Sequence, residues 1–121
     1  MAALRMAEAF VAHVARSGKK LMASISSGMG SIADNGSGGY YAYRTSKSAL
    51  QMVMKSLSID LAPRGIIAVV MNPGWVKTDM GGAGGNLSTD ESVRRMRGIF
   101  DRLTLEDSGK FWHHSGKEFP W

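Results

Sequence analysis

A run of apolar, mostly β-branched residues, Ile66–Met71, constrains the fold of this 121-residue chain more than any other feature. The run shows no alternation of apolar and polar residues, which is typical of a parallel strand covered on both faces. Pro63 and Gly65 precede it, and Asn72-Pro73-Gly74 ends it abruptly. The sequence therefore predicts a central parallel strand here, with a layer of helices on each side of its sheet.

Helically spaced apolar residues and short apolar runs alternate along the rest of the chain. The spacing predicts helices over residues 1–17, 40–61 and 89–103, and the short runs predict strands over 21–25 and, more weakly, 111–113. Ser88, with Glu91 three residues later, has the pattern of a helix N-cap. Alternating helices and strands indicate right-handed βαβ crossovers. We therefore expect an α/β fold with an open parallel sheet flanked by helices.

Ligands of such sheets bind beyond the carboxyl ends of the strands, which directs attention to residues 27–39 and 72–87. Ser26 and Ser27 lie where the first predicted strand ends. Either hydroxyl could hold a substrate oxygen, and either could equally be an ordinary turn serine. Pro73-Gly74 could let a flat ring approach the backbone, since glycine has no side chain, or could simply terminate a strand.

Tyr43 and Lys47 are four residues apart in the second predicted helix, so their side chains share one face. An ammonium near a phenol favours the phenolate and lowers a pKa that starts at about 10. A tyrosine tuned in this way can pass a proton to or from a substrate oxygen near neutral pH. The same spacing also fits an ordinary exposed helix face.

Composition excludes several classes of protein. No apolar stretch is long enough to span a membrane. The chain has no cysteine, which excludes a disulfide framework and thiolate metal sites and fits a reducing, cytoplasmic location. Its net charge of +5 is spread along the chain, and the one arginine cluster, at residues 94–102, shares its segment with Asp90, Glu91 and Asp101, as on a solvated helix face. We therefore expect no nucleic-acid partner, whereas the basic excess would suit a phosphorylated cofactor.

The three histidines do not suggest a metal site. His113 and His114 are neighbours, which we do not expect to share a face, and no carboxylate lies at ligand spacing from them. His13 is on its own in the first predicted helix. We expect these side chains to face solvent or to belong to the tail of the chain.

Three motifs, in this order, resemble the short-chain dehydrogenase/reductase family. They are Ser-Ile-Ser-Ser at 24–27, Tyr-Arg-Thr-Ser-Lys-Ser-Ala-Leu at 43–50 and Asn-Pro-Gly-Trp-Val-Lys-Thr-Asp-Met at 72–80. The segments 29–35, 38–41 and 116–121 are similar to the C-factor and Sniffer-type carbonyl reductase branch. The resemblance implies a doubly wound, Rossmann-type parallel sheet and the reduction of a small carbonyl or oxidation of an alcohol.

The resemblance also implies a role for each matching residue. Tyr43 would donate a proton to the carbonyl during reduction and act as the base in reverse, and Lys47 would lower its pKa and bind the nicotinamide ribose. Ser27, rather than Ser26, would hold the substrate oxygen. The cofactor, NADP or NAD, would contact Tyr43, Lys47, Pro73, Gly74, Val76 and Thr78, and Trp75 would line the substrate pocket.

Several features of the family have no counterpart in this chain. These are the glycine-rich phosphate-binding turn, the selector for the adenosine ribose, the Asn-Asn-Ala-Gly strand end and the helix asparagine. Residues 28–33 fit Gly-x-Gly-x-x-Ala, but we expect a loop rather than a helix after them, and residues 50–56 hold no acid. We therefore expect residues 1–121 to be a truncated domain, the carboxy-terminal half, with impaired catalysis as an isolated chain.

A different class of function is also open. The helices predicted at 2–17 and 40–61 resemble those that form the dimer interface in this family. The chain could therefore be a non-catalytic interaction module, pairing with itself or with a full-length relative. Its first strand would then expose an unpaired edge, which favours association.

Overall fold

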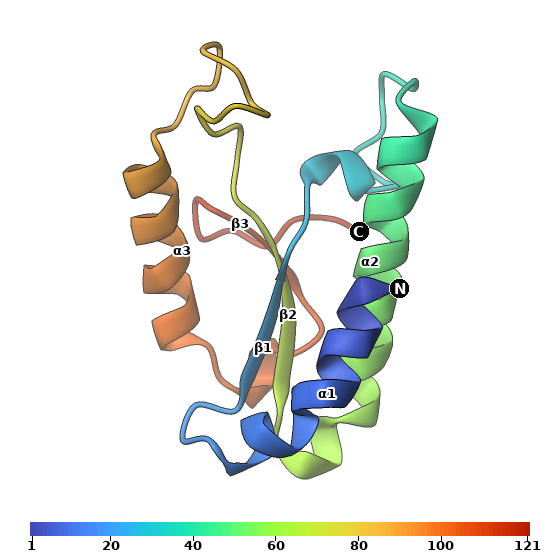
Figure 1. The fold of residues 1–121 in the computed structure, drawn as a ribbon, viewed down its shortest axis with the longest axis vertical. Helices are drawn as coiled ribbons and strands as arrows, with labels where there is room; N and C mark the ends of the chain where they lie inside the picture. Colours follow the sequence, from blue (N-terminus) through green and yellow to red (C-terminus); the bar gives the residue numbers. More distant parts are fainter.

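The computed structural model describes residues 1–121 as a three-layer α/β arrangement (Figure 1). Three parallel strands form the sheet in the order β1 (Leu21–Ile25), β2 (Ile67–Asn72) and β3 (Phe111–His113). Helices α1 (Ala2–Arg16) and α2 (Tyr41–Asp60) lie on one side of the sheet, and α3 (Thr89–Arg102) lies on the other. The predicted fold class and all six predicted elements are confirmed, with ends that differ by at most one residue.

Three short 3-10 turns were not predicted. They are η1 (Gly28–Gly30), η2 (Ala62–Arg64) and η3 (Leu105–Asp107). Each is a single turn, and so short a segment carries no hydrophobic periodicity by which the sequence could reveal it. Of the three, only η1 bears on the candidate site.

Strand β2 is buried on both faces, as its unbroken apolar run predicts. Alternate residues Ile67, Val69 and Met71 pack against Ile99 and Leu103 at the α3 side. The intervening residues Ala68 and Val70 pack with Met54 of α2 and Phe111 of β3. Because β2 is the middle strand of the sheet, its two faces join the two halves of the hydrophobic core.

Strand β1 is an edge strand. It pairs with β2 through the register Leu21–Ile67 to Ile25–Met71, and no strand pairs with its other edge. Helix α1 lies beside it (Figure 1), and the two elements line an apolar groove of about 460 Å³. No helix of the chain has both the length and the apolar character that crossing a membrane requires.

The carboxy-terminal tail, residues 114–121, folds back over the sheet. Phe119 donates its backbone N–H to the carbonyl of Phe111 at 2.7 Å, and the two rings meet edge to face with centroids 5.2 Å apart. The Trp121 ring lies 5.6 Å from the same phenylalanine, and the Trp121 carbonyl accepts a hydrogen bond from the Ala33 N–H at 2.9 Å. The tail therefore connects β3 to the loop that follows β1.

Candidate active site

The serine turn, residues 26–30, follows directly from β1. The Ser26 N–H donates to the Met71 carbonyl at 2.8 Å, which extends the pairing with β2 by one residue. Ser27 caps the 3-10 turn, since its hydroxyl oxygen accepts the Met29 N–H at 3.1 Å. The Ser26 hydroxyl is buried and accepts a hydrogen bond from Gln51 of α2, whereas Ser27 is only half-buried. Of the two serines, Ser27 is therefore the more accessible.

Tyr43 and Lys47 lie on the first two turns of α2, on one face. The Lys47 ammonium nitrogen lies 5.7 Å from the centroid of the Tyr43 ring, and 38% of Tyr43 is exposed. Lys47 takes part in none of the ion pairs of the structure. The predicted pairing of phenol and ammonium is therefore present in the fold, and both groups are accessible.

The entry to α2 has an unusual backbone. Gly38, Gly39 and Tyr40 all have positive φ angles of 66°, 67° and 52°, and Tyr40, as the N-cap, has no side-chain hydrogen bond to offer. Left-handed geometry is natural for glycine but costs energy in tyrosine. Arg44 compensates, because its guanidinium binds the Gly39 carbonyl, the Met29 carbonyl and the Ser37 hydroxyl at 3.0–3.1 Å. Arg44 thus fixes the loop beside Tyr43, a role that sequence reasoning missed.

A packing contact joins the serine turn to the Tyr43–Lys47 face. A Cβ built on Gly30 would lie 2.5 Å from Gln51 Nε2 and 2.8 Å from Lys47 Cβ, so only glycine permits this approach. The Ser48 hydroxyl also donates to the Gly30 carbonyl at 2.6 Å. The structure therefore brings the predicted serine turn and the predicted Tyr–Lys pair together on α2.

Pro73 and Gly74 lie at the carboxyl end of β2, with their backbone held from three directions. The Gly74 N–H donates to Asn72 Oδ1 at 3.1 Å, and the Ser92 hydroxyl of α3 donates to the Pro73 carbonyl at 2.8 Å. Gly74 has a φ of +83°, and a Cβ there would lie 2.7 Å from the His114 ring. The turn therefore needs glycine both for its conformation and for its packing.

The proline loop, residues 73–88, carries the other predicted cofactor and substrate residues. Trp75 is 58% exposed, and its indole N–H donates to the Gly81 carbonyl at 2.8 Å. Thr78 accepts the Gly81 N–H at 3.0 Å, and Val76 pairs with Leu87 as an isolated parallel bridge. The loop is therefore closed on itself, and its hydrogen bonds do not reach Tyr43 or Lys47.

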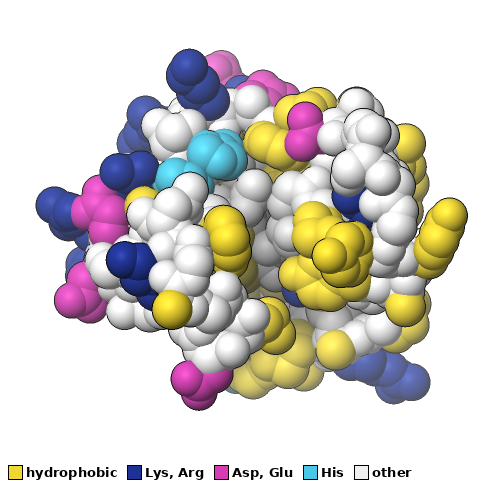
Figure 2. All heavy atoms as spheres, turned by 90° about the horizontal axis from the view of Figure 1, so that it is seen from above, with side chains coloured by type: hydrophobic (Ala, Val, Ile, Leu, Met, Phe, Trp, Pro, Cys, Tyr) yellow, Lys and Arg dark blue, Asp and Glu magenta, His cyan; other side chains and the backbone are white.

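The two regions lie across a hollow from one another. Figure 2, which views the molecule from the loop end, shows a hollow in the surface. On one side of the hollow lie α3 and the proline loop, and on the other side lies α2. The predicted residues of both sides lie at the carboxyl ends of β1 and β2 or just beyond them, as expected for this fold class. The hollow separates the side of the molecule that carries α2 from the side that carries the proline loop.

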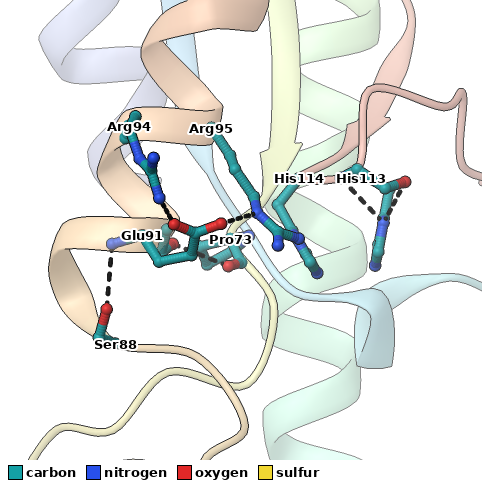
Figure 3. Close-up of polar contacts among 9 residues, drawn as sticks. Pro73, Ser88, Glu91, Arg94, Arg95, His113 and His114 are labelled. Atoms are coloured by element: carbon teal, nitrogen blue, oxygen red, sulfur yellow. Dashed lines mark hydrogen bonds and ion pairs between the residues drawn. The ribbon is translucent and has the colours of Figure 1, made fainter.

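A charged cluster lies next to Pro73 and Ser88, the two ends of the proline loop (Figure 3). Glu91 pairs with both Arg94 and Arg95, and Arg95 also lies 3.2 Å from His114 Nδ1. The rings of His113 and His114 are 4.1 Å apart, so the prediction that these neighbours would not share a face is wrong. Strand alternation ends at His113, where the chain turns and His114 donates its N–H to the Asn72 carbonyl.

The surroundings of the two histidines disfavour their charged forms. Burial lowers the pKa of His113 below 6.5, and the positive charges of Arg95 and Lys117 lower it further. Burial likewise lowers the pKa of His114, with smaller contributions from His113 and Arg95. Both side chains are partly buried where the carboxy-terminal tail begins, so they do not simply face solvent, whereas His13 is exposed. No group of three or more metal-ligating side chains is present.

The donor set fits one part of a nicotinamide cofactor. The Lys47 ammonium and the Tyr43 hydroxyl are groups that suit ribose hydroxyls. The segment 28–33 does not fit a pyrophosphate, because it forms a single 3-10 turn instead of opening an α-helix. Gly30 faces α2 and serves side-chain packing.

The parallel sheet, its two helical layers and a hollow at the strand ends define a doubly wound α/β protein. The family model of the short chain dehydrogenases matches residues 1–86, and this chain belongs to that family. It is 44% identical over 118 residues to C-signal of Myxococcus xanthus, covering 98% of this chain and 71% of that protein. It is 35% identical to 1-hydroxy-2-glutathionyl-2-methyl-3-butene dehydrogenase of a Rhodococcus strain, covering 80% of this chain and 45% of that enzyme.

Solved structures give the same assignment. The carbonyl reductase Sniffer of D. melanogaster superimposes with a TM-score of 0.92 at 36% identity, covering 98% of this chain and 52% of that one. An NADPH-bound carbonyl reductase from chicken fatty liver superimposes with a TM-score of 0.90 at 34% identity, covering 99% and 53%. This chain spans about half the length of these two reductases.

Proposed function

We propose that this chain carries the proton-transfer side of an oxidoreductase that uses NADP or NAD to reduce a small carbonyl or to oxidise an alcohol. The observation that carries the proposal is the Lys47 ammonium, 5.7 Å from the Tyr43 ring, on the helix face against which the serine turn packs. Membership of the short chain dehydrogenase family and likeness to carbonyl reductases support it.

Tyr43 is the proposed acid and base. Its hydroxyl donates a proton to the carbonyl oxygen during reduction and takes one from the alcohol in reverse. Lys47 assists because a positive charge beside a phenol stabilises the phenolate. Ser27 holds the substrate oxygen. Its hydroxyl oxygen accepts the Met29 N–H, so the hydroxyl hydrogen remains available to donate to a substrate.

The cofactor site is proposed for the nicotinamide end of the molecule. Lys47 and Tyr43 would bind the ribose, and the backbone of Pro73, Gly74, Val76 and Thr78 would border the ring, with Trp75 on the substrate side. A bound cofactor supplies or accepts the hydride. Residues 1–121 then act as the carboxy-terminal part of a short-chain dehydrogenase domain, and we expect low cofactor affinity because no phosphate-binding turn contributes.

Titration with NADPH and NADH, followed by single-turnover reduction of a small carbonyl at high protein concentration, tests the proposal. Tyr43→Phe should lower the rate by about 10²- to 10⁴-fold, since one positioned acid contributes about that much. Tyr41→Phe is the matched control, because Tyr41 lies on the same helix and is exposed. A Tyr43→Phe protein as fast as wild type would refute the assignment.

The groove between α1 and β1 favours a second function, association with another chain. Its lining is almost wholly apolar, and it includes the exposed side chains of Met6, Phe10 and Ile25 beside the unpaired edge of β1. Such edges and apolar patches attract partners. We propose a longer short-chain dehydrogenase as the partner, because the reductases that superimpose on this chain are about twice its length.

Sedimentation of this chain alone and mixed with a full-length family member tests the association. Phe10→Lys should abolish a mixed complex, whereas Ile59→Lys, at an exposed apolar position on α2 outside the groove, should leave it intact. Concentration-dependent self-association that Phe10→Lys removes would instead identify a second copy as the occupant. A chain that stays monomeric in both experiments would overturn the proposal.

A further inference from the structure

We propose that Gln51 is a positioning residue, whose buried amide fixes the serine turn against the Tyr43–Lys47 face of α2. The inference rests on the proposed function, because it concerns the same site. It assigns a task to a side chain that none of the family motifs quoted above gives a role.

Gln51 continues the line of Tyr43 and Lys47 along α2. The three residues are spaced by four, so they lie one helical turn apart on the same face. Tyr43 is partly exposed, but Gln51 is only 3% exposed. The face is therefore partly exposed at Tyr43 and buried at Gln51, whose amide is enclosed between α2 and the serine turn.

The amide of Gln51 spans two consecutive residues at the end of β1. Its nitrogen donates to the Ser26 hydroxyl at 3.1 Å and to the Ser27 carbonyl at 3.1 Å. An NH₂ group has two hydrogens, so it can serve both acceptors at once. The two bonds fix the peptide that leaves Ser27, and so the direction in which the Ser27 side chain leaves the backbone.

Close packing prevents the serine turn from taking other positions relative to α2 and the tail. A Cβ on Gly30 would lie 2.5 Å from the Gln51 nitrogen, so α2 and the turn are already in contact. On the opposite side, a Cβ on Gly28 would lie 3.2 Å from the Phe119 ring. The turn cannot move away from α2 without pressing on the tail. It also cannot rotate without breaking the bonds of Gln51.

An apolar residue at position 51 would fill the same space, so a glutamine there indicates that its hydrogen bonds are needed. Buried amides are costly unless their hydrogen bonds are made, so a glutamine here must be compensated by its two acceptors. Without it, the Ser27 carbonyl keeps only the Gly30 N–H, a bond within the turn itself. The polar links between the turn and α2 would then be the Ser48 bond to the Gly30 carbonyl and the Arg44 bond to the Met29 carbonyl, with packing beside them.

Amide hydrogen exchange tests the inference without requiring activity. Gln51→Met keeps the length of the side chain but removes its donors. Exchange of the Met29 and Gly30 amides, both bonded within the turn, should rise at least about tenfold relative to the Val70 amide of β2, because both hydrogen bonds of Gln51 are lost. Ser26→Ala is the matched control, because it leaves the bond to the Ser27 carbonyl, and its effect should be several-fold smaller.

Gln51→Glu provides a second variant of the same size without the NH₂ group, and it should show the same local increase. An equal rise in exchange at every amide, or no rise at Met29 and Gly30, would overturn the inference. Carbonyl reduction measured on the same proteins addresses the other proposal. If wild type shows no turnover while the local exchange effect is present, the proposed function fails and the role of Gln51 stands.

Discussion

The two sides of the hollow are built differently. The serine turn is held by other elements, namely Gln51 and Ser48 of α2, the packed Gly30 and the ring of Phe119. Within the proline loop, the bonds around Trp75 join residues of the loop to one another. The loop is tied to the rest of the protein at its two ends, by Pro73 and Gly74 at its start and by Ser88, which caps α3, at its end.

This difference predicts that the serine turn is rigid and that the proline loop can vary. Groups that move a proton must be placed to within fractions of an ångström, which packing against rigid elements provides. A loop closed by its own bonds can change sequence or shape without disturbing the core. We therefore expect substitutions in the serine turn and on the Tyr43–Lys47 face to be poorly tolerated. Substitutions around Trp75 in the proline loop should be tolerated, because that segment depends less on neighbouring elements.

Gly30→Ala should produce the largest loss of stability among these tests. The added methyl would lie 2.8 Å from Lys47 Cβ and 3.0 Å from the Lys47 backbone carbon, which cannot yield as a flexible side chain would. Overpacking of this kind costs about 1–3 kcal/mol in the free energy of unfolding. Denaturant melts of Gly30→Ala and of Gly36→Ala, which points into open space, compare the two directly. Equal midpoints would contradict the tight contact.

Ser92→Ala should have the next largest effect, because Ser92 is the tie between α3 and the start of the proline loop. Its hydroxyl is buried, and its loss leaves the Pro73 carbonyl without that donor, at a cost of about 1–2 kcal/mol. Ser46→Ala, at an exposed position on α2, should stay within about 0.5 kcal/mol. If the two variants have the same unfolding midpoint, the hydrogen bond from Ser92 of α3 does not stabilise Pro73.

The sequence predicted the elements because each rests on a local pattern. The unbroken run at 66–71 identified β2, and four-residue spacing placed Tyr43 and Lys47 on one face. The sequence could not predict contacts made between distant segments. The meeting of Gly30 with Lys47, and of Ala33 with the end of the tail, depends on how the elements pack.

Gln51 and Arg44 each have a sequence feature that points to the contact they make in the structure. Gln51 is a polar residue within the apolar stripe of α2, and such an exception deserves a search for a buried partner. Arg44 lies five residues after Gly39, the second glycine of a Gly-Gly pair, whose carbonyl needs a donor. His113 and His114 were misjudged because strand alternation does not extend past the end of a strand.

Trp75→Ala should have a small effect on stability. The ring is mostly exposed, and its indole bond to the Gly81 carbonyl lies within the proline loop, so the free energy of unfolding should fall by about 0.5 kcal/mol. Amide exchange at Met29 and Gly30 should not change. An exchange increase in the serine turn would show that the two sides are coupled, and the comparison would fail.

Mild acid should loosen the proline-loop side while leaving the serine turn in place. Burial holds the pKa of His114 and of His113 below 6.5 in the folded protein, so the unfolded chain binds more protons as the pH falls below that value. Stability should therefore decrease between pH 7 and pH values below the folded pKa. Asp107 does not contribute in this range, since its pKa is lowered from 3.8, chiefly by the hydrogen bond from the Thr104 backbone N–H.

The position of His114 predicts which part of the structure loses stability first at mild acid. Its ring packs directly on Gly74, whereas the serine turn is held by the Gln51 amide and the Ser48 hydroxyl, which do not titrate in this range. Exchange of the Gly74 amide, corrected for intrinsic rate, should rise on going from about pH 7.5 to about pH 5.5, and that of Gly30 should not. His114→Gln should flatten the pH dependence of the unfolding free energy. An unchanged slope in that variant would mean that the ring behind Gly74 does not titrate on unfolding, and that the two sides respond to acid alike.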